Sequence, residues 1–131
     1  MPVRIGIDLV SVASIEESVD IHHARYLRRV YTDVEIADCI SADGRPDARR
    51  LAGRFAVKEA ALKVLREGDE PISWREIGVC SDRHGRPSLA LVGAAEASAR
   101  RQGYDALDVS ISHEGPFAAA VVVAHASGKP R

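Results

Sequence analysis

The clearest helix-like spacing of hydrophobic residues in the chain lies between residues 51 and 65. Apolar side chains cover most of the circumference of this predicted helix, at Leu51, Ala52, Phe55, Ala56, Val57, Ala60, Ala61, Leu62, Val64 and Leu65. A helix that is apolar on nearly all sides is buried inside a domain. The same stretch carries charges at Arg54, Lys58, Glu59 and Lys63. Because buried ionised groups must be paired, bound to metal or directed into a cleft, the helix is expected either to line a site or to carry an internal ion-pair network.

Capping residues place the other helices. Ser14 is a candidate cap for a short helix, and Thr32 with Glu35 forms the pattern of a capping box. Asp47 is the candidate cap of the buried helix. We expect helices over residues 15–19, 33–40, 48–66 and 93–102.

Alternating apolar positions and β-branched residues predict the strands. We expect strands over residues 3–10, 74–80, 88–92, 107–113 and 117–124. Glycine and proline turns separate the second strand from the third and the fourth from the fifth, so each pair is expected to form a hairpin. Helices in blocks followed by a terminal hairpin indicate an α+β fold, with an antiparallel sheet wrapped on the long central helix.

Asp8 interrupts the first predicted strand, although aspartate is depleted in strands. Alternation places its side chain on the same face as Gly6 and on the face opposite to Ile7. One interpretation is a carboxylate on the solvent face of a sheet. The other is a carboxylate that meets Glu59 at a divalent cation.

Length and composition predict one domain over residues 1–126 and a flexible tail over residues 127–131. Of the 131 residues, 46% are apolar and 28% are charged, as in ordinary soluble domains. Cys39 and Cys80 have no spacing typical of a zinc site or a disulfide framework. With no secretory signal and no apolar run long enough to span a bilayer, we expect a cytoplasmic protein with no membrane partner.

Basic residues gather near the start of the buried helix, at Arg49, Arg50, Arg54 and Lys58. The formal net charge is −1, so nothing attracts the whole chain to nucleic acid or to an anionic membrane. The basic cluster is therefore either a solvated helix face or a local anion site. Because aromatic residues make up only 5% of the chain, a multiply phosphorylated ligand fits such a site better than a nucleic acid.

Three segments occur together in a distinctive order: Gly6-Ile7-Asp8, the stretch from Arg54 to Ala60, and Ser110-Ile111-Ser112-His113. In this order and spacing the chain resembles the holo-acyl-carrier-protein synthases, which are small single-domain 4'-phosphopantetheinyl transferases. The resemblance covers residues 3–125. It implies transfer of 4'-phosphopantetheine from coenzyme A to a serine of an apo acyl carrier protein, with release of adenosine 3',5'-bisphosphate. It also implies a Mg2+ requirement and a homotrimer with active sites between subunits.

The resemblance assigns the catalytic group to Asp8, Glu59 and Lys63. Asp8 and Glu59 match the metal-binding positions, and one or two carboxylates with substrate phosphate suit Mg2+. Lys63 matches a lysine near the pyrophosphate. From the residues alone, without the other motifs, an i,i+4 ion pair between Glu59 and Lys63 is the preferred interpretation. The base for the carrier serine is Glu59 itself, or a water held by Glu59 or the metal.

The resemblance assigns coenzyme A binding to Arg54 and His113. Arg54 matches an arginine at the 3'-phosphate, where a guanidinium suits phosphate geometry, and Arg49 and Arg50 are expected to assist. His113 matches a histidine that reaches the nucleotide from an adjacent subunit.

The chain departs from the family pattern at two places. The loop after Lys63 retains only Gly68, where the family usually has a glycine-rich loop that approaches phosphates closely. The first helix carries Glu16 and Glu17 where the family commonly places basic residues that meet an acidic carrier. We therefore expect a less acidic or specialised carrier.

Two other functions remain compatible with these residues. One is a coenzyme A or nucleotide-binding protein on the same fold with weak or lost transfer, which the changed loop favours. The other is an assembly protein whose subunit interface uses the apolar strand from Phe117 to Ala124. A requirement for a divalent metal separates the enzyme from the assembly protein.

Overall fold

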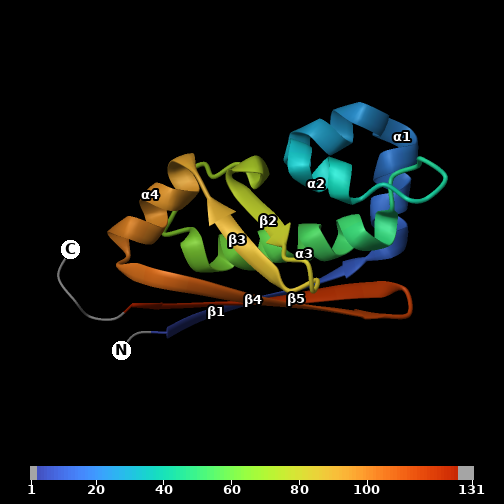
Figure 1. The fold of residues 1–131 in the computed structure, drawn as a ribbon. Helices are drawn as coiled ribbons and strands as arrows, with labels where there is room; N and C mark the ends of the chain where they lie inside the picture. Colours follow the sequence, from blue (N-terminus) through green and yellow to red (C-terminus); the bar gives the residue numbers. More distant parts are fainter. Residues whose placement is uncertain (1–2, 127–131) are drawn as a thin grey trace.

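A three-stranded antiparallel sheet forms one face of the molecule, and the helices of the described chain lie on its other side (Figure 1). The computed structural model describes residues 3–126, so the tail expected over residues 127–131 lies outside the described residues. The elements are β1 (Val3–Ser11), α1 (Val12–Val30), α2 (Asp33–Asp38), α3 (Ala48–Leu65), the 3-10 turn η1 (Trp74–Glu76), β2 (Ile77–Ser81), β3 (Pro87–Leu91), α4 (Gly93–Arg101), β4 (Tyr104–Glu114) and β5 (Phe117–Ala126).

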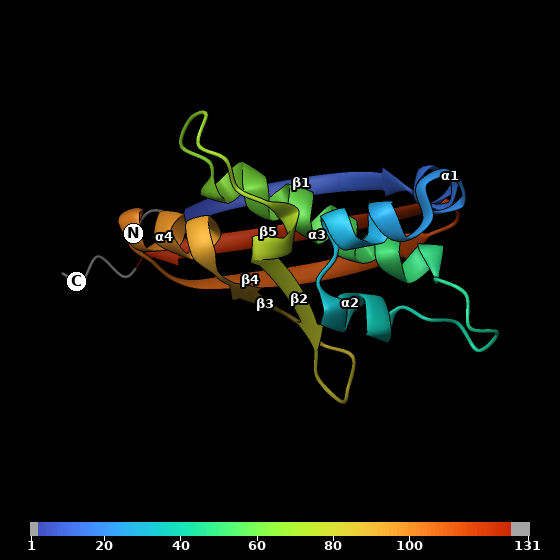
Figure 2. The ribbon, with the colours of Figure 1, turned by 90° about the horizontal axis from the view of Figure 1, so that it is seen from above.

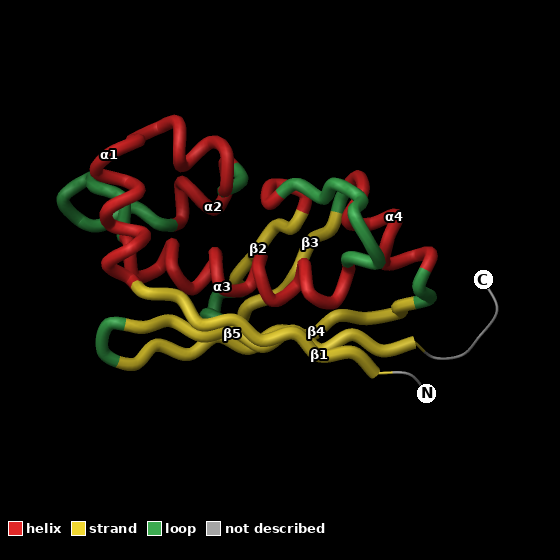
Figure 3. Tube along the Cα trace, turned by 180° about the vertical axis from the view of Figure 1, so that it is seen from behind, coloured by secondary structure: helices red, strands yellow, loops and turns green. Residues whose placement is uncertain are grey.

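The sheet has the order β1-β5-β4, so the C-terminal strand lies between the other two. Asp8 pairs with Ala120 on β5, and Ala120 pairs in turn with Ile111 on β4. The hairpin β2-β3 forms a separate two-stranded sheet. This sheet lies beside α3, on the same side of the three-stranded sheet as α2 and α4 (Figures 2 and 3). The predicted antiparallel sheet is therefore present.

Most of the helix and strand signals in the sequence produced the expected local structure. The Thr32–Glu35 capping box forms with both of its hydrogen bonds, and the Asp47 carboxylate accepts hydrogen bonds from the backbone of Arg49 and Arg50. Both cysteines are free, and burial raises the pKa of the Cys39 thiol to about 11. Cys39 thus fills a buried position in the core.

The first helix is longer than predicted and does not use Ser14 as its cap. Helix α1 begins at Val12, whose backbone N–H donates to Pro116 O at 2.9 Å, and the side chain of Ser11 makes no capping bond. A contact with the β4–β5 turn therefore fixes the start of α1, and no local capping pattern records that contact. The helix continues to Val30 through a kink at His23.

The second strand begins later than the predicted start at residue 74. Trp74, Arg75 and Glu76 form η1, and β2 starts only at Ile77. Ser73 and Glu76 make a second capping box, with Ser73 N donating to Glu76 Oε1 at 2.8 Å. The Ser-x-x-Glu signal was visible in the sequence, but the apolar residues around it favoured a strand.

Helix α3 packs tightly against β1, and Gly6 makes the close approach possible. A methyl group at Gly6 would overlap the carbonyl oxygen of Ala60 and lie 3.2 Å from Val64. Gly6 therefore lies almost against the α3 backbone, and Asp8, two residues further on the same face of β1, is brought next to the same helix.

Replacing Gly6 with alanine is expected to destabilise the protein by about 1–3 kcal/mol, because the methyl group must push β1 away from α3. Urea unfolding followed by circular dichroism measures the change. Gly68→Ala is the matched control, since nothing lies within 4 Å of the methyl group it would add. Equal unfolding midpoints for the two variants would contradict the close contact.

Candidate active site

Asp8 lies on the face of β1 that meets α3, and Lys63 covers it. Lys63 Nζ is 3.4 Å from Asp8 Oδ1 and donates to the backbone oxygen of Ile7 at 2.6 Å. The side chain of Asp8 is 22% exposed, so solvent and small ligands reach it. The interpretation that Asp8 occupies the solvent face of the sheet is wrong: that face carries Ile5, Ile7 and Leu9, each at least 60% exposed.

Glu59 lies one helical turn before Lys63 on α3 and is half-buried. Its Oε1 accepts a hydrogen bond from Trp74 Nε1 at 3.1 Å. Within residues 3–126 no ion pair joins Glu59 to Lys63, so the predicted i,i+4 alternative is wrong. Lys63 instead turns toward Asp8, because β1 approaches α3 next to Ala60.

The donor chemistry of this group fits Mg2+. No cluster of three or more histidine, cysteine, aspartate or glutamate side chains within residues 3–126 is arranged to hold a metal. Mg2+ does not need one, because it binds through one or two carboxylates and completes its octahedron with water and substrate phosphate. Asp8 contacts Lys63, Glu59 lies one helical turn before Lys63, and Glu59 Oε2 makes no hydrogen bond within the described residues.

A second group of predicted residues lies at the start of α3. His113 Nε2 is 3.0 Å from the backbone oxygen of Arg49. Gly53 leaves room for this contact, since a methyl group there would lie 3.1 Å from His113 Nε2. The guanidinium of Arg50 donates to Asp38 O at 3.2 Å and is 3.5 Å from the carboxylate of Asp47.

Arg54 lies on α3 within electrostatic reach of Cys39, the residue that follows α2. Its charge acts on the Cys39 thiol, opposing the rise in pKa that burial causes. Within residues 3–126 Arg54 makes no ion pair, and its buried Nε has no hydrogen-bond partner. Arg54 lies about 7.5 Å along the helix from Glu59. Arg49, whose backbone oxygen contacts His113, lies about 15 Å along the helix from Glu59 and about 21 Å from Lys63. Within one chain Asp8 therefore meets Lys63, one helical turn after Glu59, whereas His113 contacts the start of the same helix.

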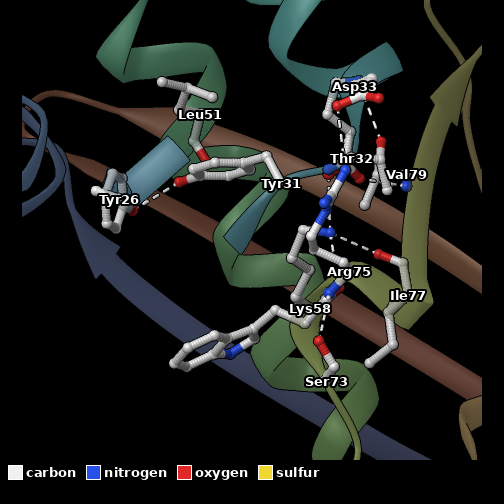
Figure 4. Close-up of polar contacts among 12 residues, drawn as sticks. Tyr26, Tyr31, Thr32, Asp33, Leu51, Lys58, Ser73, Arg75, Ile77 and Val79 are labelled. Carbon is white, nitrogen blue, oxygen red and sulfur yellow. Dashed lines mark hydrogen bonds and ion pairs between the residues drawn. The ribbon is translucent and has the colours of Figure 1, made fainter. Parts of the chain in front are cut away.

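Lys58 and Glu35 form a buried ion pair that sequence analysis foresaw only in general terms. Both side chains are fully buried, and Lys58 Nζ lies 2.8 Å from Glu35 Oε1. Lys58 also donates to Ile77 O at 2.6 Å (Figure 4) and to Trp74 O at 2.9 Å, while Glu35 Oε2 accepts from Val79 N. Burial lowers the pKa of Lys58, and Glu35 acts against this change.

This ion pair connects α2, α3 and β2. The Tyr31 ring packs beside it, with Lys58 Nζ 6.0 Å from the ring centroid. The Tyr31 hydroxyl bonds to Tyr26 and to the backbone oxygen of Leu51 (Figure 4), and burial raises its pKa. The charges on α3 thus have different environments: Lys58 lies in an internal ion pair, whereas Glu59 and Lys63 lie at the edge of the helix where solvent reaches them.

The acidic loop after Lys63 is tied to α4. Arg101 makes ion pairs with Glu67, at 3.3 Å, and with Glu70. These contacts draw two of the acidic side chains toward α4. Glu16 and Glu17 on α1 are exposed.

Comparison with known proteins shows to which protein superfamily the chain belongs. The model of the 4'-phosphopantetheinyl transferase superfamily matches residues 4–122. The chain therefore belongs to this superfamily. Within residues 3–126, no helix is long and apolar enough to cross a membrane.

Relatives within the superfamily are holo-[acyl-carrier-protein] synthases. The protein of this name from Moorella thermoacetica is 40% identical over 122 residues, which cover 93% of each chain. The one from Chloroflexus aurantiacus is 42% identical over 132 residues, covering 92% of this chain and 96% of the relative. The family predicted from the three sequence segments is thereby confirmed.

Solved structures of such synthases share the fold. The Helicobacter pylori synthase in complex with coenzyme A superimposes with a TM-score of 0.79 at 32% identity, covering 93% of this chain and all of that one. The Bacillus anthracis synthase in complex with coenzyme A (3',5'-ADP) gives a TM-score of 0.73 at 30% identity, covering 94% and 96% of the two chains. The predicted α+β fold is confirmed.

Proposed function

We propose that this chain transfers 4'-phosphopantetheine from coenzyme A to a serine of an apo acyl carrier protein, with Mg2+. The observation that carries the proposal is the contact of Asp8 on β1 with Lys63 on α3, one helical turn after Glu59. The relatives named holo-[acyl-carrier-protein] synthase and the related structures with coenzyme A support it.

In the proposed reaction, the serine oxygen forms a bond to the phosphorus next to pantetheine, and the bond from that phosphorus to the nucleotide phosphate breaks. Adenosine 3',5'-bisphosphate leaves, and the serine proton passes to Glu59 directly or through a water. When bound between Asp8 and Glu59, Mg2+ supplies positive charge at the pyrophosphate. Lys63 turns from Asp8 to the leaving phosphate, and Arg54 binds the 3'-phosphate with its unpaired guanidinium.

The active molecule is proposed to be a homotrimer. The outer face of β1 exposes Val3, Ile5, Ile7 and Leu9, and the helices of the described chain lie on the opposite side of the sheet (Figure 1). A contiguous apolar face of this kind marks a surface that another protein covers. The family resemblance supports a second copy as that protein, and the separation of His113 from Glu59 within one chain is consistent with His113 acting across the interface.

Ile7→Lys is expected to dissociate the homotrimer and to lower transfer strongly, because it places a charge in the proposed interface. Sedimentation equilibrium gives the mass of the wild type and the variant. Val34→Lys on α2 is the matched control, since Val34 and Ile7 are both 60% exposed. A wild type that is monomeric at the concentrations used for transfer would reject the trimer.

Intact-mass spectrometry of apo carrier proteins tests the reaction. The carriers are incubated with this protein, coenzyme A and Mg2+, with or without EDTA, and the set includes one acidic fatty-acid carrier and several less acidic ones. We expect an EDTA-sensitive gain of one phosphopantetheine, larger on the less acidic carriers because Glu16 and Glu17 repel an acidic partner. Coenzyme A binding without a mass gain on any carrier would favour the binding protein.

A further inference from the structure

Trp74 makes the one hydrogen bond that the Glu59 carboxylate receives within the described residues, from indole Nε1 to Oε1 at 3.1 Å. It is also the only tryptophan of the chain. Its ring packs at a tilt on Phe55, with 5.9 Å between the ring centroids. Phe55 lies one helical turn before Glu59 on α3, so the indole extends along the helix from one residue to the other.

The position of Trp74 is set independently of Glu59. The backbone oxygen of Trp74 accepts a hydrogen bond from Lys58, which is fully buried and paired with Glu35. The capping box of Ser73 and Glu76 fixes the turn that carries Trp74, and the Glu76 carboxylate also accepts from Ala94 N on α4. The indole N–H is therefore held by the protein framework before any ligand binds.

A donor held in this way changes what a carboxylate can do. With Oε1 bound to the indole, rotation of the Glu59 carboxyl group is restricted, and Oε2 remains for a ligand. Partners that hydrogen-bond to metal-binding side chains orient them, and their loss typically weakens metal binding or activity by about 10–100-fold. The indole is neutral, so it orients the carboxylate without competing for its charge as a lysine would.

We propose that Trp74 is a positioning residue, whose indole N–H holds one oxygen of Glu59 so that the other meets the divalent cation. This inference rests on the proposed function, because it takes Glu59 as a metal-binding residue. The buried Lys58–Glu35 pair then has a role at the active site as well as in the core, since it anchors the backbone of Trp74.

The matched variants for the test are Trp74→Phe and Glu59→Gln. Trp74→Phe keeps an aromatic ring against Phe55 and removes the N–H donor together with the second ring of the indole. The probe is Mn2+, titrated into protein saturated with coenzyme A, and free Mn2+ is followed by electron paramagnetic resonance. We expect Trp74→Phe to raise the Mn2+ dissociation constant about 10-fold or more. The Mg2+ concentration for half-maximal transfer should rise similarly, and high Mg2+ should restore most of the turnover, which it would not do for a damaged fold.

The wild-type protein provides a second readout that needs no variant at position 74. Because Trp74 is the sole tryptophan, its fluorescence reports on the Glu59 carboxylate, and Mg2+ should produce a saturable change in emission that Glu59→Gln abolishes. If Glu59→Gln weakens Mn2+ binding but Trp74→Phe does not, the positioning role is overturned and the metal site stands. If Glu59→Gln leaves Mn2+ binding unchanged, the proposed metal site itself fails. An emission that ignores Mg2+ in an otherwise active enzyme would also count against the inference.

Discussion

Glu59→Gln is expected to lower the rate of phosphopantetheine transfer by at least about 100-fold. Glutamine keeps the size of the side chain and can still accept the hydrogen bond from Trp74, but it loses the negative charge. The variant therefore loses a charged metal ligand and a proton acceptor, and loss of a proton acceptor alone typically costs about 100–10,000-fold. Initial rates with saturating coenzyme A and a carrier, measured by intact mass, give the comparison.

The control for this prediction is Glu96→Gln on α4. Glu96 forms an exposed i,i+4 ion pair with Arg100, at 2.9 Å, and such pairs contribute little to stability. Its transfer rate should stay within about twofold of the wild type, because a surface substitution far from the chemistry changes little. A Glu59→Gln variant that retains most of its Mg2+-dependent activity would remove Glu59 from the catalytic group and leave Asp8 as the candidate ligand.

Local signals in the sequence were sufficient for most helices and strands. The Thr32 capping box and the Asp47 cap act within a few residues, so the pattern alone records them. The start of α1 depends instead on a bond to Pro116, far along the chain. Local patterns contain no information on such a contact, and this explains the error at Ser14.

At the candidate site, too, local side-chain direction was predictable and long-range contacts were not. Alternation placed Asp8 on the correct face of β1, because side-chain direction in a strand follows from position alone. The partners of the charged residues were not predictable, since Glu35, Trp74 and Asp8 reach α3 from three separate elements. Helical spacing suggested that Lys63 pairs with Glu59, whereas the close approach of β1 at Gly6 gives Lys63 a different partner.

Lys58→Met is expected to destabilise the protein by about 3–5 kcal/mol, because it leaves the buried Glu35 carboxylate without its cation. For a chain of this length the melting temperature should fall by about 10–18 °C. Thermal unfolding by circular dichroism, at one fixed protein concentration, measures the loss. Lys63→Met carries the same substitution on the same helix and is the matched control: its ion pair with Asp8 is partly exposed, so its stability should change by no more than about 1 kcal/mol while transfer is lost.

The double variant Glu35→Gln with Lys58→Met separates two explanations for that loss. If the penalty comes from an unpaired buried charge, removing the charge from Glu35 should recover part of the stability, because neutral replacements of a buried pair are often tolerated. Glutamine at position 35 still offers an oxygen to the backbone N–H of Thr32 or Val79. If the double variant is no more stable than Lys58→Met, the loss comes from the hydrogen bonds that Lys58 donates to Trp74 and Ile77. In that case the lysine stabilises the fold by tying η1 and β2 to α3, and neutralising Glu35 is secondary.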